Sequence, residues 1–238
     1  MFTISHPSDS RGQADHGWLK SRYTFSFADY YNPHRMHFGA LRVINDDLIE
    51  AGGGFETHPH RDMEIVSIPL EGKLEHQDSV GRHGVISKGE VQIMSAGTGI
   101  YHSEKNASNE ESVKLLQIWV LPKKLGVTPR YEQKDFSGSD KDLTLIVAPD
   151  GRGGSLTINQ EAFFSLAKLK MNQVIDYKLN QKQNGLYLFI INGLIEVNGI
   201  TLTSRDGLGV TVSDDITIKS LGDSELLLME VPMINYNL

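Results

Sequence analysis

Short apolar or alternating runs recur along the whole chain, and Gly, Asn, Asp or Pro separates each run from the next. Runs of this kind between turn residues are typical of β-strands, and their spacing favours a sandwich or a barrel. No segment shows the period of about 3.6 residues that marks a long amphipathic helix. We therefore expect an all-β protein. The clearest predicted strands are residues 40–44, 64–70, 91–94, 114–120, 143–147, 163–169, 186–191, 208–212 and 225–231.

A weak internal repeat indicates two copies of one β unit. The segment LEGKLE (70–75) resembles INGLIE (191–196), and each has the pattern of a strand, a Gly turn and a second strand. Chance similarity of Gly turns is the alternative explanation. Two units fit the chain length, and the turn-rich segment PDGRGG (149–154) is a natural place for a boundary. We therefore predict an N-terminal domain over residues 1–148 and a C-terminal domain over residues 149–238.

Histidine is confined to the N-terminal part of the chain. All nine histidines lie in the first 102 residues, and the chain has no cysteine, which excludes disulfides and thiol catalysis. Two pairs stand out, His58 with His60 and His102 with Glu104. Residues i and i+2 of a strand point to the same side. Two such pairs on facing strands would give one transition metal three imidazoles and a carboxylate, although histidines in exposed loops are the alternative.

The spacing around these residues is close to the two cupin motifs, and this favours a metal site. In the usual first motif the acidic residue lies one place nearer the second glycine than Glu64 does. Because strand faces alternate, a shift of one place points Glu64 away from the metal, and Glu104 is the better fourth ligand. The two matching patterns are Gly52-x5-His58-x-His60-x3-Glu64-x7-Gly72 and Gly99-x2-His102-x3-Asn106.

Longer segments resemble the pirin family, and within it the bacterial members described as quercetin 2,3-dioxygenases. The resemblance implies a bicupin, two double-stranded β-helix barrels face to face, with one metal in the N-terminal barrel. The family's four ligands fall here on His58, His60, His102 and Glu104. The segments that carry the resemblance are HGWLKSRYTFSFADYYNP (16–33), LRVINDDLIEAGGGFETHPHRDMEIVSIPLEGKLEHQDSVG (41–81), GEVQIMSAGTGIYHSE (89–104) and PRYEQKDF (129–136).

The resemblance implies a metal-dependent dioxygenase. Our hypothesis is that it opens the flavonol ring of quercetin, or of a similar enolizable aromatic, with O2 and releases CO. Glu104 would be both a ligand and the base that takes the proton of the 3-hydroxyl group. Pirins are usually described with iron, so Fe2+ is the first choice of metal. Three imidazoles and one carboxylate exclude none of Ni2+, Co2+, Mn2+, Cu2+ and Zn2+.

Two other functions stay open at this point. Pirins include regulators, so the chain could be a metal- or redox-sensing protein that acts through a protein partner. A purely structural metal that stabilises the barrel is the third interpretation. The net charge of -7 and the lack of a Lys/Arg run argue against direct nucleic-acid binding. Neither a signal peptide nor an apolar run of about 18 residues is indicated, so we expect a cytoplasmic protein without a membrane span.

Three further groups of residues have two interpretations each. The aromatic N-terminal segment, with Trp18, Tyr23 and Phe27, could form a lid on a pocket, but packing across the barrel is the interpretation we favour. The sequence Asn45-Asp46-Asp47 could supply a carboxylate pair but has the composition of a turn. His76 is expected to be a hydrogen-bonded residue of the sheet or the surface.

Overall fold

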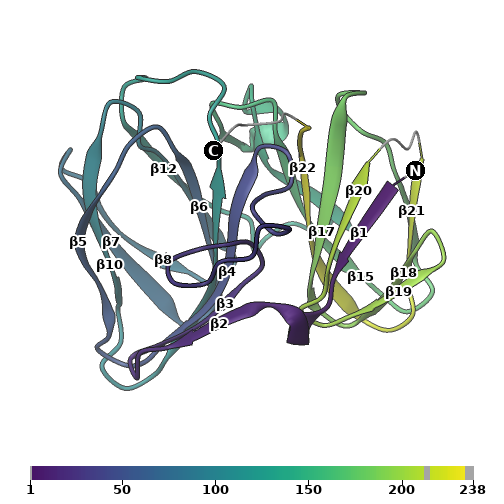
Figure 1. Cartoon of the computed structure of the whole chain (residues 1–238), viewed down its shortest axis with the longest axis horizontal. Coiled ribbons are helices and arrows are strands. Elements are labelled where there is room, and N and C mark those ends of the chain that lie inside the picture. The colour runs from purple at the N-terminus through teal and green to yellow at the C-terminus, as the bar shows by residue number, and fades with distance from the viewer. Residues whose placement is uncertain (1, 212–214, 234–238) are drawn as a thin grey trace.

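The chain folds almost entirely into β-strands in a computed structural model that describes residues 2–211 and 215–233. In these two ranges the only helical elements are two short 3-10 turns, η1 (Ser8–Ser10) and η2 (Arg152–Gly154). No helix in the described ranges is long and apolar enough to cross a membrane. Figure 1 shows two β lobes side by side, which confirms the predicted all-β bicupin architecture.

The first lobe is built from two facing sheets. The larger sheet has seven strands in the order β12-β9-β6-β11-β4-β3-β2, and the smaller has four in the order β5-β10-β7-β8. Neighbouring strands in both sheets are antiparallel. The strands are β2 (Gly12–Asp15), β3 (Leu19–Tyr23), β4 (Leu41–Ile49), β5 (Gly54–His60), β6 (Glu64–Glu71), β7 (Lys73–Asp78), β8 (His83–Ser87), β9 (Glu90–Ser95), β10 (Ile100–Asn106), β11 (Val113–Val120) and β12 (Arg130–Asp135).

The second lobe repeats this plan. Its sheets have the orders β1-β20-β17-β22-β15-β13-β14 and β16-β21-β18-β19, so β17 to β22 take the places that β6 to β11 take in the first lobe. Gly72 follows β6 and Gly193 follows β17, and both have the positive φ that glycine adopts without strain. The strands are β1 (Phe2–His6), β13 (Leu143–Ala148), β14 (Leu156–Thr157), β15 (Phe163–Leu169), β16 (Val174–Tyr177), β17 (Asn184–Asn192), β18 (Leu194–Val197), β19 (Ile200–Thr203), β20 (Gly207–Thr211), β21 (Ile216–Ser220) and β22 (Ser224–Pro232).

The N-terminal strand belongs to the second lobe. β1 pairs with β20, in the place that β12 occupies in the first lobe, and it lies beside β20 in Figure 1. β13, which lies before the predicted boundary, pairs with β15 in the second sheet. The strands on either side of residue 148 therefore share one sheet, and the boundary at that residue stays a prediction.

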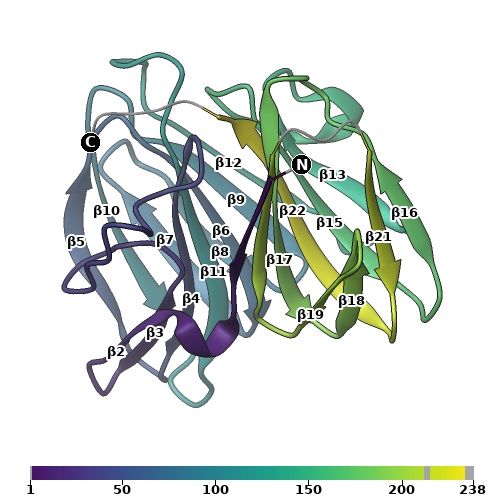
Figure 2. The same ribbon diagram turned by 45° about the vertical axis from the view of Figure 1, so that its right-hand side comes forward.

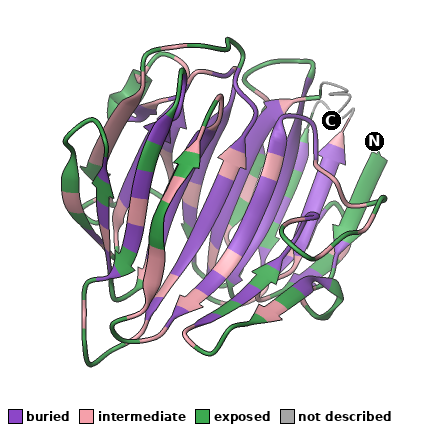
Figure 3. Cartoon of the chain, turned by 60° about the vertical axis from the view of Figure 1, so that its left-hand side comes forward, coloured by how far each residue is buried: buried purple, intermediate pink, exposed green. Residues whose placement is uncertain are grey.

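The nine predicted strands all coincide with strands of the two seven-stranded sheets, although residue 212, the last of the segment 208–212, lies outside the described residues. These two sheets pack against each other and are covered on their outer faces by the four-stranded sheets. Figure 2 shows the resulting layers, and Figure 3 shows that burial is concentrated in the long central strands. Central strands with both faces buried produce continuous apolar runs, which is why these nine are readable in the sequence.

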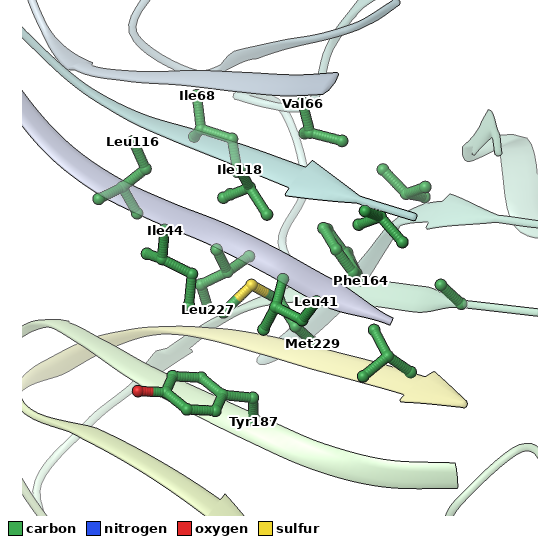
Figure 4. Close-up of a cluster of buried hydrophobic side chains, with 14 of the residues drawn as sticks. Leu41, Ile44, Val66, Ile68, Leu116, Ile118, Phe164, Tyr187, Leu227 and Met229 are labelled. Carbon is green, nitrogen blue, oxygen red and sulfur yellow. The ribbon is translucent and has the colours of Figure 1, made fainter. Parts of the chain in front are cut away.

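Strand alternation gives each central strand of the first lobe two different faces. On β4, Leu41 and Ile44 join the core between the lobes, where they meet Leu227 and Met229 of β22 (Figure 4). Asn45 and Asp47, in contrast, line a cavity between the two sheets of the first lobe. The turn expected at residues 45–47 is wrong, because β4 runs through them and each of the three residues lies opposite one residue of β11 and one of β3.

Candidate metal centre

The three predicted histidine ligands come together on two neighbouring strands of the four-stranded sheet. His58 and His60 project from the same side of β5, and His102 lies directly opposite His58 on β10. The ring centroids of the three imidazoles are 4.5 to 4.8 Å apart. Because one ligand atom from each lies within 4.8 Å of the others, the three side chains can share one ion.

The hydrogen bonds of these rings leave nitrogen lone pairs directed at one another. His58 Nδ1 lies 2.7 Å from the carbonyl oxygen of Glu56, which accepts only from N–H, so its Nε2 carries the lone pair. His58 Nε2 and His102 Nε2 are 3.0 Å apart. Two nitrogens that bind one ion at about 2.1 Å each lie about 3.0 to 3.4 Å apart, so the observed distance fits a shared cation.

The environment also keeps two of these imidazoles, His60 and His102, neutral, as metal ligation requires. Burial, followed by the charge of His58, lowers the pKa of His60 to about 4. Burial, with contributions from the neighbouring histidines, lowers the pKa of His102 to about 2. Both rings are therefore free of the competing proton at neutral pH.

Glu104 lies two residues beyond His102 on the same face of β10 and is almost completely buried. Gln117 Nε2 donates to its Oε2 at 2.5 Å, and Ser67 Oγ donates to its Oε1 at 3.3 Å. Burial raises the pKa of Glu104 to about 7, against the opposing effect of these two donors. Its carboxylate groups with His76 and His102 rather than with His58 and His60 in this structure.

His76 is the residue of this site that the sequence interpretation undervalued. It is fully buried on β7, and its Nδ1 lies 3.4 Å from His102 Nδ1. Its Nε2 lies 3.3 Å from Asp78 Oδ2. If His76 Nε2–H donates to Asp78, then His76 Nδ1 accepts from His102 Nδ1–H, and the His102 lone pair faces His58. The HxD spacing of His76 and Asp78 on an inward strand face was the signal available in the sequence.

Glu64 faces the other way, as its position in the motif predicts. Its Oε2 accepts from Ser95 Oγ at 2.7 Å and from the backbone N–H of Asn159 in the second lobe at 3.1 Å. In the part of the chain that the structure describes, Glu64 belongs to neither group of side chains that could share an ion. Its side chain links the lobes, which is a structural use of a buried carboxyl group.

A cavity of about 390 Å³ opens beside the histidines, between the two sheets of the first lobe. Its surface is mostly apolar, and Trp119 stands edge-on to His60 with 4.9 Å between ring centroids. The N-terminal segment supplies part of this wall, so these residues line a pocket as well as packing across the barrel. The aromatic residues of the lining are Trp18, Tyr23, Phe27, Phe55 and Trp119.

Comparison with known proteins agrees with this fold and site. The pirin family model matches residues 5–120, and the model of the quercetinase C-terminal cupin domain matches residues 145–231. A quercetin 2,3-dioxygenase of Escherichia coli is 46% identical over 228 residues, which cover 95% of this chain and 97% of that protein. A pirin-like protein of Caulobacter vibrioides is 42% identical over 227 residues, which cover 94% of this chain and 97% of that protein.

Among solved structures, the bacterial pirin YhhW of Escherichia coli in complex with nickel(II) superimposes with a TM-score of 0.94. Its sequence is 44% identical, and the match covers 98% of this chain and all of that one. Three observations agree: the sequence identity over nearly the whole length, the two-lobed fold and the histidine cluster in the first lobe. This chain is therefore a member of the pirin family.

Proposed function

We propose that this protein is a metal-dependent dioxygenase that opens the ring of quercetin, or of a similar enolizable aromatic, with O2 and releases CO. One observation carries the proposal: three imidazoles converge beside a cavity of about 390 Å³ with aromatic side chains in its walls. That volume lies in the range of about 300 to 1,000 Å³ that is usual for small-molecule sites. The relatives named quercetin 2,3-dioxygenase support the same reaction.

We propose that His58, His60, His102 and Glu104 hold one divalent transition metal. The three histidines already share one centre, and Glu104 is the nearest carboxylate on the strand that carries His102. Fe2+ remains our first choice, while the nickel(II) bound by a close structural relative supports Ni2+ as well. When bound, such an ion supplies a Lewis acid for the flavonol oxygens and a template for O2.

The side chains of the cavity have separate tasks in this reaction. The aromatic walls hold a flat ring system and exclude water from it. Glu104 accepts the proton of the 3-hydroxyl group on a carboxylate oxygen, since it is a buried carboxylate that lines the cavity beside the histidines. Gln117 and Ser67 hold that carboxylate in place through their hydrogen bonds.

The proposed reaction needs no reductant. The two carbon–carbon bonds that flank the carbon bearing the 3-oxygen break, and that carbon leaves as CO. The two atoms of O2 form new bonds to the carbons on either side, so the substrate itself supplies all the electrons that reduce O2. The second product is a depside, an ester between the two aromatic rings.

The test is aerobic turnover of quercetin by Fe2+-reconstituted protein, with the CO trapped and quantified. One CO per quercetin, absent in His102→Ala and retained in His83→Ala, would support the proposal. His83 is a suitable control because it is exposed and bonds to Glu75 at the surface. Loss of quercetin without CO would refute 2,3-dioxygenation. If no quercetin is lost with Fe2+, Ni2+, Co2+, Mn2+, Cu2+ or Zn2+, the proposed dioxygenase activity is refuted and a metal-sensing regulator is favoured.

A further inference from the structure

Two groups of side chains that could share an ion overlap at one residue, His102. The first group contains His58, His60 and His102, and the second contains His76, His102 and Glu104. His58 and His60 line the cavity, whereas His76 is fully buried. A neutral imidazole carries one N–H and one lone pair, and only the nitrogen with the lone pair binds a metal. The place of the ring proton on His102 therefore decides which group can hold the ion.

The contact with Asp78 fixes the ring proton of His76. His76 Nε2 lies 3.3 Å from Asp78 Oδ2, and both side chains are fully buried. Asp78 Oδ1 accepts from the backbone N–H groups of Val80 and Arg82, which hold the carboxylate against the turn after β7. Because a carboxylate accepts hydrogen bonds and does not donate them, His76 carries its proton on Nε2 and its lone pair on Nδ1. The ring of Tyr131 packs against His76 with 4.8 Å between centroids and restricts its rotation.

His102 lies between two nitrogen lone pairs and has one proton to offer them. On one side, His76 Nδ1 lies 3.4 Å from His102 Nδ1. On the other side, His102 Nε2 lies 3.0 Å from His58 Nε2, which carries a lone pair because the other nitrogen of His58 donates to a backbone carbonyl. A proton on His102 Nδ1 is donated to His76 and leaves the His102 lone pair on the cavity side, where His60 adds a third imidazole. The proton and the ion must take opposite nitrogens of the ring.

We propose that Asp78 and His76 are positioning residues, which keep the proton of His102 on Nδ1 and so place the metal at Nε2, on the cavity side. This inference rests on the proposed ligand set of the dioxygenase and adds the two residues that orient it. Partners that accept the second N–H of a metal-binding histidine fix its ring and raise its basicity as a ligand. Here the partner of His102 is an imidazole whose own N–H goes to a carboxylate. Loss of such partners typically lowers metal affinity by about 10- to 100-fold.

Asp78→Asn tests this assignment, because it reverses a hydrogen bond with almost no change of volume. The two backbone N–H groups hold the amide oxygen in the place of Oδ1, so the NH2 group takes the place of Oδ2 and donates to His76 Nε2. His76 then carries its proton on Nδ1 and directs it at His102 Nδ1, where it disfavours a second proton. His76→Leu is the second variant, and it removes the acceptor altogether. His83→Gln is the matched control on β8, because His83 is exposed and its ring contacts Glu75.

The measurements are the affinity for Zn2+, from competition with a chelator, and the 15N chemical shifts of the histidine rings in the Zn2+-loaded protein. We expect the wild type to carry the His102 proton on Nδ1. Asp78→Asn and His76→Leu should each weaken Zn2+ binding by about 10- to 100-fold, and His83→Gln should leave it unchanged. Asp78→Asn should have no further effect in the His76→Leu background, because Asp78 acts through His76. A purely structural role of Asp78 in the turn would instead give additive losses.

Three results would each overturn the inference: a His102 proton on Nε2, a Zn2+ affinity unchanged in both variants, or additive losses in the double variant. Unchanged Zn2+ affinity in His58→Ala would refute the proposed ligand set and this inference with it. Turnover is scored separately, so a protein that behaves as expected with Zn2+ but releases no CO from quercetin with any metal supports the inference and refutes the proposed reaction.

Discussion

Asp47 provides a test of the electrostatics of the cavity that is independent of any ligand. Burial, together with the charges of Asp46 and Glu104, raises the pKa of Asp47 to about 7 from its ordinary value of 3.8, despite the hydrogen bond from Ser21. Because the pKa is raised in the folded state, the Asp47 side chain contributes its full stabilisation below pH 4. This contribution is lost as the pH rises toward 7. The two values differ by roughly 3 pH units, so the charged carboxylate costs the folded state about 4 kcal/mol above pH 7.

Asp47→Asn removes this cost, because the amide keeps an acceptor for Ser21 Oγ and never ionises. The free energy of unfolding of Asp47→Asn minus that of the wild type should increase by about 1.4 kcal/mol per pH unit between pH 4 and 7. Above pH 7 this difference should stay constant. Urea unfolding of the metal-free proteins at pH 5, 6, 7 and 8 measures this difference. A difference that does not change with pH would refute the reasoning.

The neighbouring aspartate, Asp46, is a control, because its substitution by asparagine should change the free energy of unfolding in the opposite direction. Asp46 points to the other face of β4, where it forms salt bridges with Arg11 and Arg205, both at 3.3 Å. The Arg11 side chain is only 3% exposed, so Asp46→Asn leaves a buried cation without its partner. This variant should therefore lower the free energy of unfolding, by roughly 3 kcal/mol. Adjacent carboxyl groups on one strand would then have opposite effects on stability.

Four further variants, three at proposed ligands and one at Glu64, are tested by metal analysis and turnover. His58→Ala and His102→Ala should each lose most of the bound metal, and near-stoichiometric metal in both would end the ligand assignment. Glu104→Gln should retain some metal but lose turnover, because an amide cannot accept the substrate proton; a wild-type rate would contradict its role as base. Glu64→Gln should leave the metal content unchanged, since that side chain faces the second lobe, and a large loss of metal would reinstate it as a ligand.

The central strands were readable in the sequence because they are buried on both faces and therefore rich in apolar residues. β6 and β17 are almost wholly buried and appear as continuous apolar runs. The strands of the outer sheets, such as β16, alternate between exposed and partly buried positions and have weaker patterns. The histidine pairs were an exception, because their spacing of two residues marks one face of a strand whatever the surrounding pattern.

The residues 45–47 and His76 show where local composition misleads. The local preference of Asn-Asp-Asp is a turn. Here β3 and β11 pair with the two edges of β4 and hold these residues extended. His76 resembled an ordinary sheet residue because its partner His102 lies 26 positions away along the chain. Tertiary contacts of this range cannot be assigned from one sequence by periodicity alone.

The sequence by itself determined the β class, the repeated unit and the two pairs, His58 with His60 and His102 with Glu104. These features depend on strand period and short spacings, which are local properties of the chain. The meeting of the two pairs at one metal was predicted from the cupin motifs and the pirin resemblance. Only the tertiary structure decided that β1 completes the second lobe, that Glu64 links the lobes and that Asp47 faces the cavity. Each of these depends on which strands pair and which face each sheet buries, and burial is a property of the assembled layers.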